Sequence, residues 1–330
     1  MKLTNSEIKK ILGNWDLGSV LEIKKAEKGV VNHNWIVKTD KDKYVLRGLS
    51  KNKKLKNIKF ELKYLNYLDK KGFEYELPLA IPDVKGRKII RFGKNYVFVY
   101  RYIEGIVKKD FGKNELKEMA KMMAEYHLLL EKMKIRNNAG RSEPFLKETI
   151  LREVRDYRKD IGKSKKKEDE IFLEEVKKLV PLMDNLKVVD FNKLKQYPTH
   201  SDLNPENVVW KGHKLVGVID FENVPTGNEP LMKDISIVIQ IGCSKDGEKM
   251  NFSKAKYFIK EYRKLRKLKD CEIKLLPEII LTTYIADFSY AYWMLKNDPE
   301  RAKLYRLEKY SKAAQWYWKN KEKIVEELLK

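Results

Sequence analysis

The stretch that decides the fold is His200-Ser201-Asp202-Leu203-Asn204-Pro205-Glu206-Asn207, and Ile219-Asp220-Phe221 follows it. Residues 208–210 and 215–220 are β-rich and flank a turn at Lys211-Gly212-His213-Lys214, so they predict a hairpin. Such a hairpin would return Asp220 to the side of Asp202 and Asn207. A simple Asx turn at Asp-Leu-Asn-Pro is the alternative interpretation.

The residue types of this stretch suit phosphoryl transfer. One carboxylate must orient an acceptor hydroxyl and take its proton, which is a role for Asp202. An amide oxygen and a second carboxylate are hard ligands of the kind that hold Mg²⁺ against nucleotide phosphates, and Asn207 and Asp220 supply them. The spacing H-x-D-x-x-x-x-N with a later D-F pair is typical of the kinase catalytic loop.

The first hundred residues predict a β-rich unit around one helix. Strands are expected over residues 20–28, 30–39, 43–49, 88–92 and 96–102, and a helix over 54–70. Arg47 ends the third strand. Glu61 lies beside the apolar stripe of the helix, which points it along a buried flank. The order of these elements predicts an Arg47–Glu61 pair, and two unrelated surface side chains are the alternative.

The rest of the chain predicts helices. Asn114 is the expected N-cap of a helix whose apolar stripe includes His127, a histidine expected to be hydrogen-bonded in the core. A second helical region covers residues 143–186, and its charged run at 163–169 is expected to be a solvated turn or an insertion. The predicted fold is α+β with two lobes, residues 1–102 and residues 103–330.

At this point the chain resembles the aminoglycoside phosphotransferase and choline kinase superfamily, which includes a homoserine kinase branch. The resemblance rests on the catalytic-loop stretch, on Tyr44–Arg47, on Phe60-Glu61-Leu62, on Gly217-Val218-Ile219-Asp220-Phe221-Glu222, and on Asp234-Ile235. It implies a two-lobed protein-kinase-like fold that uses ATP or GTP with Mg²⁺. It also implies that Asp202 is the catalytic base and that Asn207 and Asp220 are metal ligands.

The resemblance implies further roles around the nucleotide. Arg47 and Glu61 would orient the phosphates, and a loop with Gly29 and Asn32 would cover them. The hinge against adenine would include Val99, Arg101 and Tyr102, and His200 and Asp234 would brace the catalytic loop.

The chain also departs from the protein-kinase pattern. It has a single glycine in the phosphate loop, Arg47 in place of lysine, Glu222 in place of the D-F-G glycine, and no activation segment. A small hydroxylated acceptor is therefore expected rather than a protein. Glu222, Tyr284, Asp287 and Trp293 are the candidate acceptor residues, because aromatic rings and a carboxylate suit an amine. The candidates are choline, ethanolamine, homoserine and an aminosugar, and an aromatic core is the alternative role for these rings.

Composition leaves other classes to weigh. Among 330 residues, 71 Lys+Arg against 48 Asp+Glu give a net charge of +23. This excess is compatible with a lysine-rich solvated surface, with a nucleic-acid or anionic-membrane partner, and with small anionic substrates such as nucleotides. No motif for specific nucleic-acid binding accompanies it. A catalytically inactive kinase-like binding protein and a lipid- or protein-directed kinase are further alternatives.

Two cysteines and no signal-peptide pattern predict a cytoplasmic location. The apolar residues 275–295 contain charged side chains, so a buried helix is expected rather than a membrane span. The oligomeric state stays open.

Overall fold

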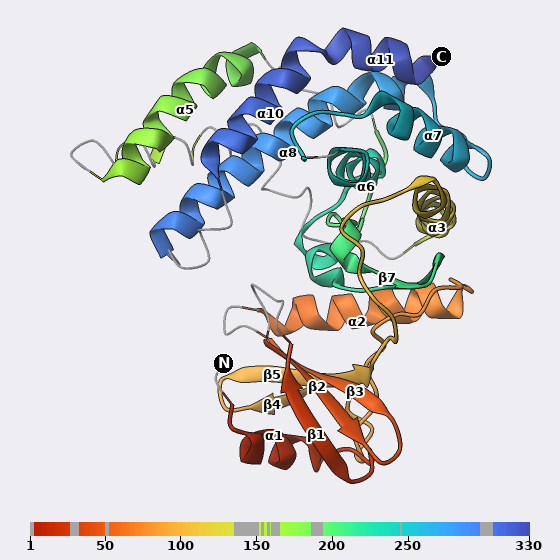
Figure 1. Cartoon of the computed structure of the whole chain (residues 1–330). Coiled ribbons are helices and arrows are strands. Elements are labelled where there is room, and N and C mark those ends of the chain that lie inside the picture. The colour runs from red at the N-terminus through yellow and green to blue at the C-terminus, as the bar shows by residue number, and fades with distance from the viewer. Residues whose placement is uncertain are drawn as a thin grey trace.

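The computed structural model describes residues 3–26, 33–49, 53–134, 166–185, 194–244, 246–297 and 306–330, with four single positions between 152 and 159. Figure 1 shows two lobes, with a β-sheet near the N-terminus and a bundle of helices that carries the C-terminus at its far end. The α+β class and the two-lobed architecture are confirmed.

The first lobe is built on a five-stranded sheet in the order β1-β2-β3-β5-β4. Every neighbouring pair is antiparallel. The strands are β1 (Val20–Lys25), β2 (His33–Thr39), β3 (Lys43–Gly48), β4 (Ile90–Phe92) and β5 (Asn95–Arg101). Arg47 on central β3 lies opposite Phe98 on β5. The sheet thereby holds Arg47, the predicted phosphate-orienting side chain, near its middle.

Two helices cover the two faces of this sheet. Helix α1 (Asn5–Leu12) packs with Leu46 and Val99, whereas α2 (Leu55–Lys70) packs with Val45 and Phe98. Successive residues of a strand point to opposite faces. Arg47 therefore faces α2, which lies between the sheet and the helical lobe in Figure 1.

Helix α1 was not predicted, although the sequence carries a signal for it. The Thr4 side chain accepts a hydrogen bond from the Glu7 backbone N–H, and the Glu7 carboxylate accepts one from the Thr4 N–H. This capping box is readable as T-x-x-E ahead of an apolar run.

The predicted hairpin is confirmed as β7 (Val208–Lys211) and β8 (Lys214–Val218), paired antiparallel. A segment that follows α2 borders its other edge. The Glu76 N–H donates to the Val216 carbonyl at 2.8 Å, and the Val218 N–H donates to the Glu76 carbonyl at 3.0 Å. Gly217 permits this close approach, because a Cβ there would lie 2.7 Å from the Ile103 side chain. The strand that leads to Asp220 is thus hydrogen-bonded on one side to β7 and on the other to the segment that follows α2.

The second lobe is mainly helical. Its larger helices are α3 (Lys113–Glu131), α5 (Lys167–Asn185), α6 (Met232–Ile237), α7 (Phe252–Arg263), α8 (Asp270–Asn297), α10 (Leu307–Lys319) and α11 (Lys321–Leu329). Short elements join them: β6 (Gln196–Tyr197), η3 (Pro205–Asn207), η4 (Phe221–Thr226), β9 (Glu229–Pro230) and η5 (Val238–Gly242). None of the described helices is long and apolar enough to cross a membrane.

Two local predictions in this lobe were wrong. Helix α3 begins one residue before Asn114, and Glu115 caps it by accepting from the Gly112 N–H at 3.1 Å. The charged run at 163–169 is not wholly a solvated turn, because α5 begins within it. Asp169 is buried there and accepts a hydrogen bond from the Tyr292 hydroxyl at 2.7 Å. The charge pattern of the run predicted exposure, but a contact with Tyr292 on α8, far along the chain, buries Asp169.

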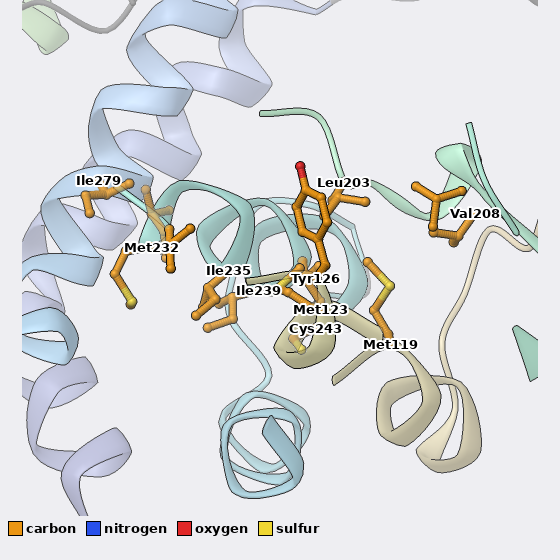
Figure 2. Packing of buried hydrophobic residues seen from close by; sticks show 14 of the residues in the cluster. Met119, Met123, Tyr126, Leu203, Val208, Met232, Ile235, Ile239, Cys243 and Ile279 are labelled. Atoms are coloured by element: carbon orange, nitrogen blue, oxygen red, sulfur yellow. The ribbon is translucent and has the colours of Figure 1, made fainter. Parts of the chain in front are cut away.

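The catalytic-loop stretch is anchored by apolar packing. Leu203 and Val208 are buried, and Figure 2 shows them close to Met119, Met123 and Tyr126 of α3. Met232 and Ile235 of α6 belong to the same cluster. Close packing of this kind restricts the backbone on either side of Leu203. The polar residues beside Leu203 are therefore held by the core of the helical lobe.

Candidate active site

Asp202 is held by two side-chain amides. The Asn204 Nδ2 donates to its Oδ1 at 2.8 Å, and the Asn207 Nδ2 donates to its Oδ2 at 2.9 Å. Burial, supported by the negative charge of Asp220, raises the pKa of Asp202 to about 6, against the opposing effects of His200 and the two amides. A carboxylate with a raised pKa and fixed oxygens is well suited to accept a proton near neutral pH.

Asn207 and Asp220 lie next to each other through the backbone, because the Ile219 N–H donates to the Asn207 carbonyl at 3.0 Å. The Asn207 amide nitrogen also donates to the Asp202 backbone carbonyl at 2.8 Å, so its Oδ1 is the atom left to face a cation. Asp220 has φ 65° and ψ 56°, and 41% of its side chain is exposed. This left-handed backbone is uncommon for a residue other than glycine and occurs at functional sites.

These two side chains fit a divalent cation only in part. In the described part of the chain, no group of three or more His, Cys, Asp or Glu side chains could hold a metal ion. Mg²⁺ commonly takes one or two protein oxygens and completes its shell with water and substrate phosphates. The donor set of Asn207 and Asp220 therefore suits a cation that arrives with a nucleotide.

Arg47 joins the two lobes through a buried ion network. Its Nη1 lies 3.4 Å from the Glu61 Oε1, and its Nη2 lies 3.0 Å from the Asp220 Oδ1 and 3.4 Å from the Glu222 Oε2. Burial acts to lower the pKa of Arg47, but the three carboxylates outweigh burial and raise it. Burial raises the pKa of Glu61, and Arg47 opposes this shift. The predicted Arg47–Glu61 pair is present and extends to Asp220.

Lys53 is a member of this network that sequence reasoning missed. Its Nζ lies 2.8 Å from the Glu222 Oε2 and 3.9 Å from the Glu61 Oε2. The side chains of Lys53 and Glu222 are each only 14% exposed. No local pattern marks Lys53 among its neighbouring lysines, because its partner lies 169 residues away. The Arg47 network therefore contains two cations and three carboxylates among the described residues.

His200 links the catalytic loop to the residue that precedes Asp220, and Asp234 binds the backbone of the loop. The His200 Nε2 bonds to the Ile219 carbonyl at 2.9 Å, and the Asp234 Oδ1 accepts from the Ser201 N–H at 2.7 Å. Ser201 has φ 61°, a conformation that such bonds help to hold.

His127 is a buried core histidine, as predicted. Its Nδ1 lies 2.7 Å from the Tyr262 hydroxyl, and its Nε2 lies 3.4 Å from Asp234. His127 therefore supports the loop through Asp234.

The predicted nucleotide residues differ in their placement. Gly29 and Asn32 lie outside the described residues. The Val99 side chain is buried on the α1 face of the sheet, away from Arg47, and its carbonyl accepts from the Ile81 N–H. Arg101 is exposed and pairs with Asp42 at 3.1 Å, and the Tyr102 N–H donates to the Lys43 carbonyl. Alternation along β5 explains why the Val99 side chain cannot face the same side as Arg47.

The predicted acceptor residues are not all brought together. Glu222 belongs to the Arg47 network, and Asp287 on α8 accepts from the Gln240 amide at 3.2 Å. Tyr284 is buried, its ring packs at a tilt against Tyr317, and its hydroxyl donates to the Gly247 carbonyl.

Trp293 lies apart from these residues. It is 45% exposed and stacks on Tyr290 at 5.9 Å. Trp293 follows Asp287 by six residues, and this spacing places the two side chains on different faces of the helix.

A carboxylate with a raised pKa, on a loop opposite a buried arginine network, is the arrangement expected of a kinase-like phosphotransferase. The comparison with family models agrees, since residues 22–268 match the model described as the phosphotransferase enzyme family APH. The chain belongs to this family.

Several curated relatives are named homoserine kinase. One from Agrobacterium fabrum is 26% identical over 275 residues, which is 83% of this chain and 81% of that protein. One from Parvibaculum lavamentivorans is 24% identical over 279 residues, covering 84% and 81%. Together with the family, these relatives support a small-molecule kinase that acts on a hydroxyl group.

Solved structures share the fold. A spectinomycin phosphotransferase in complex with ADP and spectinomycin is 11% identical, with a TM-score of 0.71, and 98% of this chain and 99% of that chain are covered. A microcompartment-associated aminopropanol kinase is 13% identical, with a TM-score of 0.61 and coverage of 99% and 98%. The two-lobed architecture is therefore that of small-molecule phosphotransferases.

Proposed function

We propose that this protein transfers the γ-phosphoryl group of ATP, or of GTP, to the hydroxyl of a small amine-bearing alcohol in the cytoplasm, with Mg²⁺ as the metal. Residues 1–102 would form the nucleotide-binding lobe and residues 103–330 the catalytic and acceptor-binding lobe. The observation that carries the proposal is the arrangement of Asp202, Asn207, Asp220 and Arg47, four side chains within one connected set of contacts.

In the proposed reaction, Asp202 orients the acceptor hydroxyl and accepts its proton. The acceptor oxygen forms a bond to the γ-phosphorus while the bond from that phosphorus to the β-phosphate oxygen breaks, so the nucleoside diphosphate leaves with the electron pair. Asn207 and Asp220 would hold Mg²⁺, which supplies charge stabilisation for the phosphates. Arg47 and Lys53 provide positive charge on the other side of the same region.

The relatives support the amine-bearing acceptor. They include proteins named homoserine kinase and a structure described as an aminopropanol kinase. Choline, ethanolamine and aminosugars are further members of the proposed acceptor class. Asp287 is the acceptor contact we favour. We place less weight on Tyr284, whose hydroxyl is bonded, and on Trp293, which lies on an outer face.

The test is a phosphotransfer screen of these alcohols with Mg-ATP and Mg-GTP. Asp202→Ala is expected to keep nucleotide binding, measured by calorimetry, and to lower kcat by about 10² or more, because general-base catalysis contributes at that level. Asp110→Ala, which changes an exposed carboxylate, is the matched control. Normal turnover by Asp202→Ala would contradict the assigned role, and phosphorylation of neutral polyols alone would contradict the acceptor class.

A further inference from the structure

A chain of buried hydrogen bonds leads from Arg266, in the turn after α7, to the catalytic loop. The Arg266 Nη1 lies 3.2 Å from the Tyr262 hydroxyl, which lies 2.7 Å from the His127 Nδ1. The His127 Nε2 lies 3.4 Å from the Asp234 Oδ2, and the Asp234 Oδ1 accepts from the Ser201 N–H at 2.7 Å. Tyr262, His127 and Asp234 are fully buried. The chain therefore passes from α7 through α3 and α6 to the loop that carries the proposed base.

Arg266 is held at the outer end of this chain by two carboxylates. Its Nε and Nη2 donate to the Glu131 Oε1 at 3.0 and 2.9 Å, and its Nη2 lies 3.3 Å from the Glu272 Oε1. These bonds orient the guanidinium, whose remaining nitrogen, Nη1, bonds to Tyr262. Because a guanidinium has donors only, the Tyr262 oxygen must accept from it. The donor at this end of the chain is therefore fixed.

The direction of the remaining bonds follows from this fixed donor. A phenol has a single proton, and burial raises the pKa of Tyr262, so the hydroxyl keeps that proton. With its oxygen accepting from Arg266, the hydroxyl donates to the His127 Nδ1. At the other end of the chain a carboxylate only accepts, so Asp234 requires a proton on the His127 Nε2. Both ends therefore favour one state of His127, which is neutral and carries its proton on Nε2.

We propose that Tyr262 is a positioning residue for phosphotransfer, because it holds His127 in this neutral state and, through Asp234, holds the backbone of the catalytic loop. Arg266 sets the direction of the bonds. The inference rests on the proposed function for its effect on turnover, and it adds two residues that the reaction described so far does not use.

The state of His127 matters because of its effect on Asp234. Ser201 has φ 61°, a backbone conformation that is unfavourable without support, and Asp202 follows it directly. The bond from the Ser201 N–H to Asp234 is part of that support. A second proton on His127 would make Asp234 the partner of an imidazolium and draw its negative charge toward Oδ2, away from Ser201. The loop would lose support, and Asp202 would lose its orientation.

Other ionisable groups also act on His127. Burial lowers its pKa, and Asp234 on α6 and Glu131 on α3 oppose this shift. The charge of Arg266 acts in the same direction as burial. The neighbouring Tyr126 ring lies 5.6 Å away, and burial raises the pKa of its hydroxyl. A hydrogen bond donated to Nδ1 stabilises only the neutral imidazole, so removal of this bond is expected to raise the pH at which His127 takes up a second proton.

Nitrogen-15 NMR of the histidine side chains tests the assigned state directly. In the wild-type protein at pH 7.5, the His127 Nδ1 is expected to be unprotonated and the Nε2 protonated, and the spectrum of His127→Gln identifies these signals. In Tyr262→Phe the imidazolium should appear at a higher pH than in the wild-type protein. Tyr67→Phe is the matched control, because it removes another hydroxyl that bonds to α3, at the Leu129 carbonyl, and it should leave the titration unchanged.

Turnover tests the positioning role. With Mg-ATP and an accepted alcohol, Tyr262→Phe is expected to lower kcat less than about three-fold at pH 8 and about 10-fold at pH 6.5, each relative to the wild-type protein, with an unchanged KM for ATP. A glutamine in place of His127 has an acceptor and a donor but cannot take up a proton. The added pH dependence should therefore vanish when Tyr262→Phe is combined with His127→Gln.

The outcomes separate this inference from the proposed function. A proton on the His127 Nδ1 of the wild-type protein, or an unchanged titration in Tyr262→Phe, would overturn the inference alone. An equal loss of kcat at both pH values would assign Tyr262 a purely structural role and would also overturn it. If no alcohol is phosphorylated while Mg-ATP binds, the proposed function fails, whatever state of His127 the NMR spectra show. The wild-type spectrum needs no variant to fold.

Discussion

The side-chain amide of Asn207 donates to the Asp202 carboxylate at 2.9 Å, so one hydrogen bond orients both the proposed catalytic base and a proposed metal ligand. Asn204 donates to the other oxygen of the same carboxylate at 2.8 Å, but its own Oδ1 already accepts from the Glu206 N–H. The two asparagines thus share one function, support of Asp202, and differ in whether an oxygen is left for a cation.

This difference gives a matched pair of variants. Asn207→Ala is expected to raise the Mg²⁺ concentration needed for half-maximal phosphotransfer by about 10-fold or more, since it removes a ligand oxygen. Asn204→Ala should lower kcat without moving the Mg²⁺ requirement. A Mg²⁺ titration of activity measures both, and equal shifts in the two variants would contradict the assignment of Asn207 as a ligand.

The Arg47 network predicts that lysine cannot replace this arginine. The guanidinium contacts Glu61 through one nitrogen and Asp220 and Glu222 through another, a fork that a single ammonium cannot reproduce. Arg47→Lys is expected to lower kcat/KM for ATP about 10- to 100-fold, as for the loss of a charge-assisted hydrogen bond. Arg91→Lys, which changes an exposed side chain of β4, is the control, and steady-state kinetics with varied ATP is the measurement. Unchanged kinetics in Arg47→Lys would rule out a need for the fork.

The burial of the His127 imidazole predicts that the folded protein loses stability at acid pH. Burial lowers its pKa below the usual 6.5, against the effect of Asp234, so the folded protein keeps it neutral while the unfolded chain takes up a proton. Its contribution is therefore complete above pH 6.5 and declines as the pH falls below that value, by up to about 1.4 kcal/mol per pH unit.

Urea unfolding between pH 7.5 and 5 tests this effect. His127→Gln should flatten the pH dependence relative to the wild-type protein, and His213→Gln, which changes an exposed imidazole, is the control. An equally steep dependence in His127→Gln would assign the pH effect to other groups.

The capping box of α1 predicts a modest stability effect. Thr4→Ala removes the side-chain acceptor for the Glu7 N–H and is expected to lower the free energy of unfolding by about 1 kcal/mol. Ser6→Ala, inside the same helix turn and exposed, should change it by less than about 0.5 kcal/mol. Chemical denaturation compares the two variants, and equal values would mean that the cap does not stabilise the sheet lobe.

The sequence predicted those parts of the candidate site that depend on the order of residues within a short segment. The spacing of His200, Asp202 and Asn207 and the hairpin that follows place Asp220 correctly, because turn chemistry and strand alternation are local. Lys53 and Tyr262 escaped notice because their partners, Glu222 and His127, lie far along the chain.

The aromatic residues on α8 also show that sequence spacing alone does not reveal which side chains tertiary packing will bury. Periodicity groups Tyr284 and Trp293 in one helix, but packing against α10 buries the first and leaves the second at the surface. The sequence shows that aromatic rings able to contact an amine are present on this helix. It cannot distinguish them from aromatic rings that pack in the core.

The hydrogen bonds between Glu76 and β8 have a mechanical consequence. Residues around Glu76 lie in sequence between α2 and β4 of the sheet lobe, yet they are hydrogen-bonded to the strand that ends beside Asp220. If the sheet moved relative to the helical lobe, the segment at Glu76 would stay with β8, so bending would fall in the stretches on either side of Glu76 and in the crossing after β5. The chain just after Glu76 is fastened to the sheet again, because the Ile81 N–H donates to the Val99 carbonyl of β5. Amide hydrogen exchange should then find the Glu76 and Val218 N–H groups equally slow with and without nucleotide, while the short stretch after α2 changes.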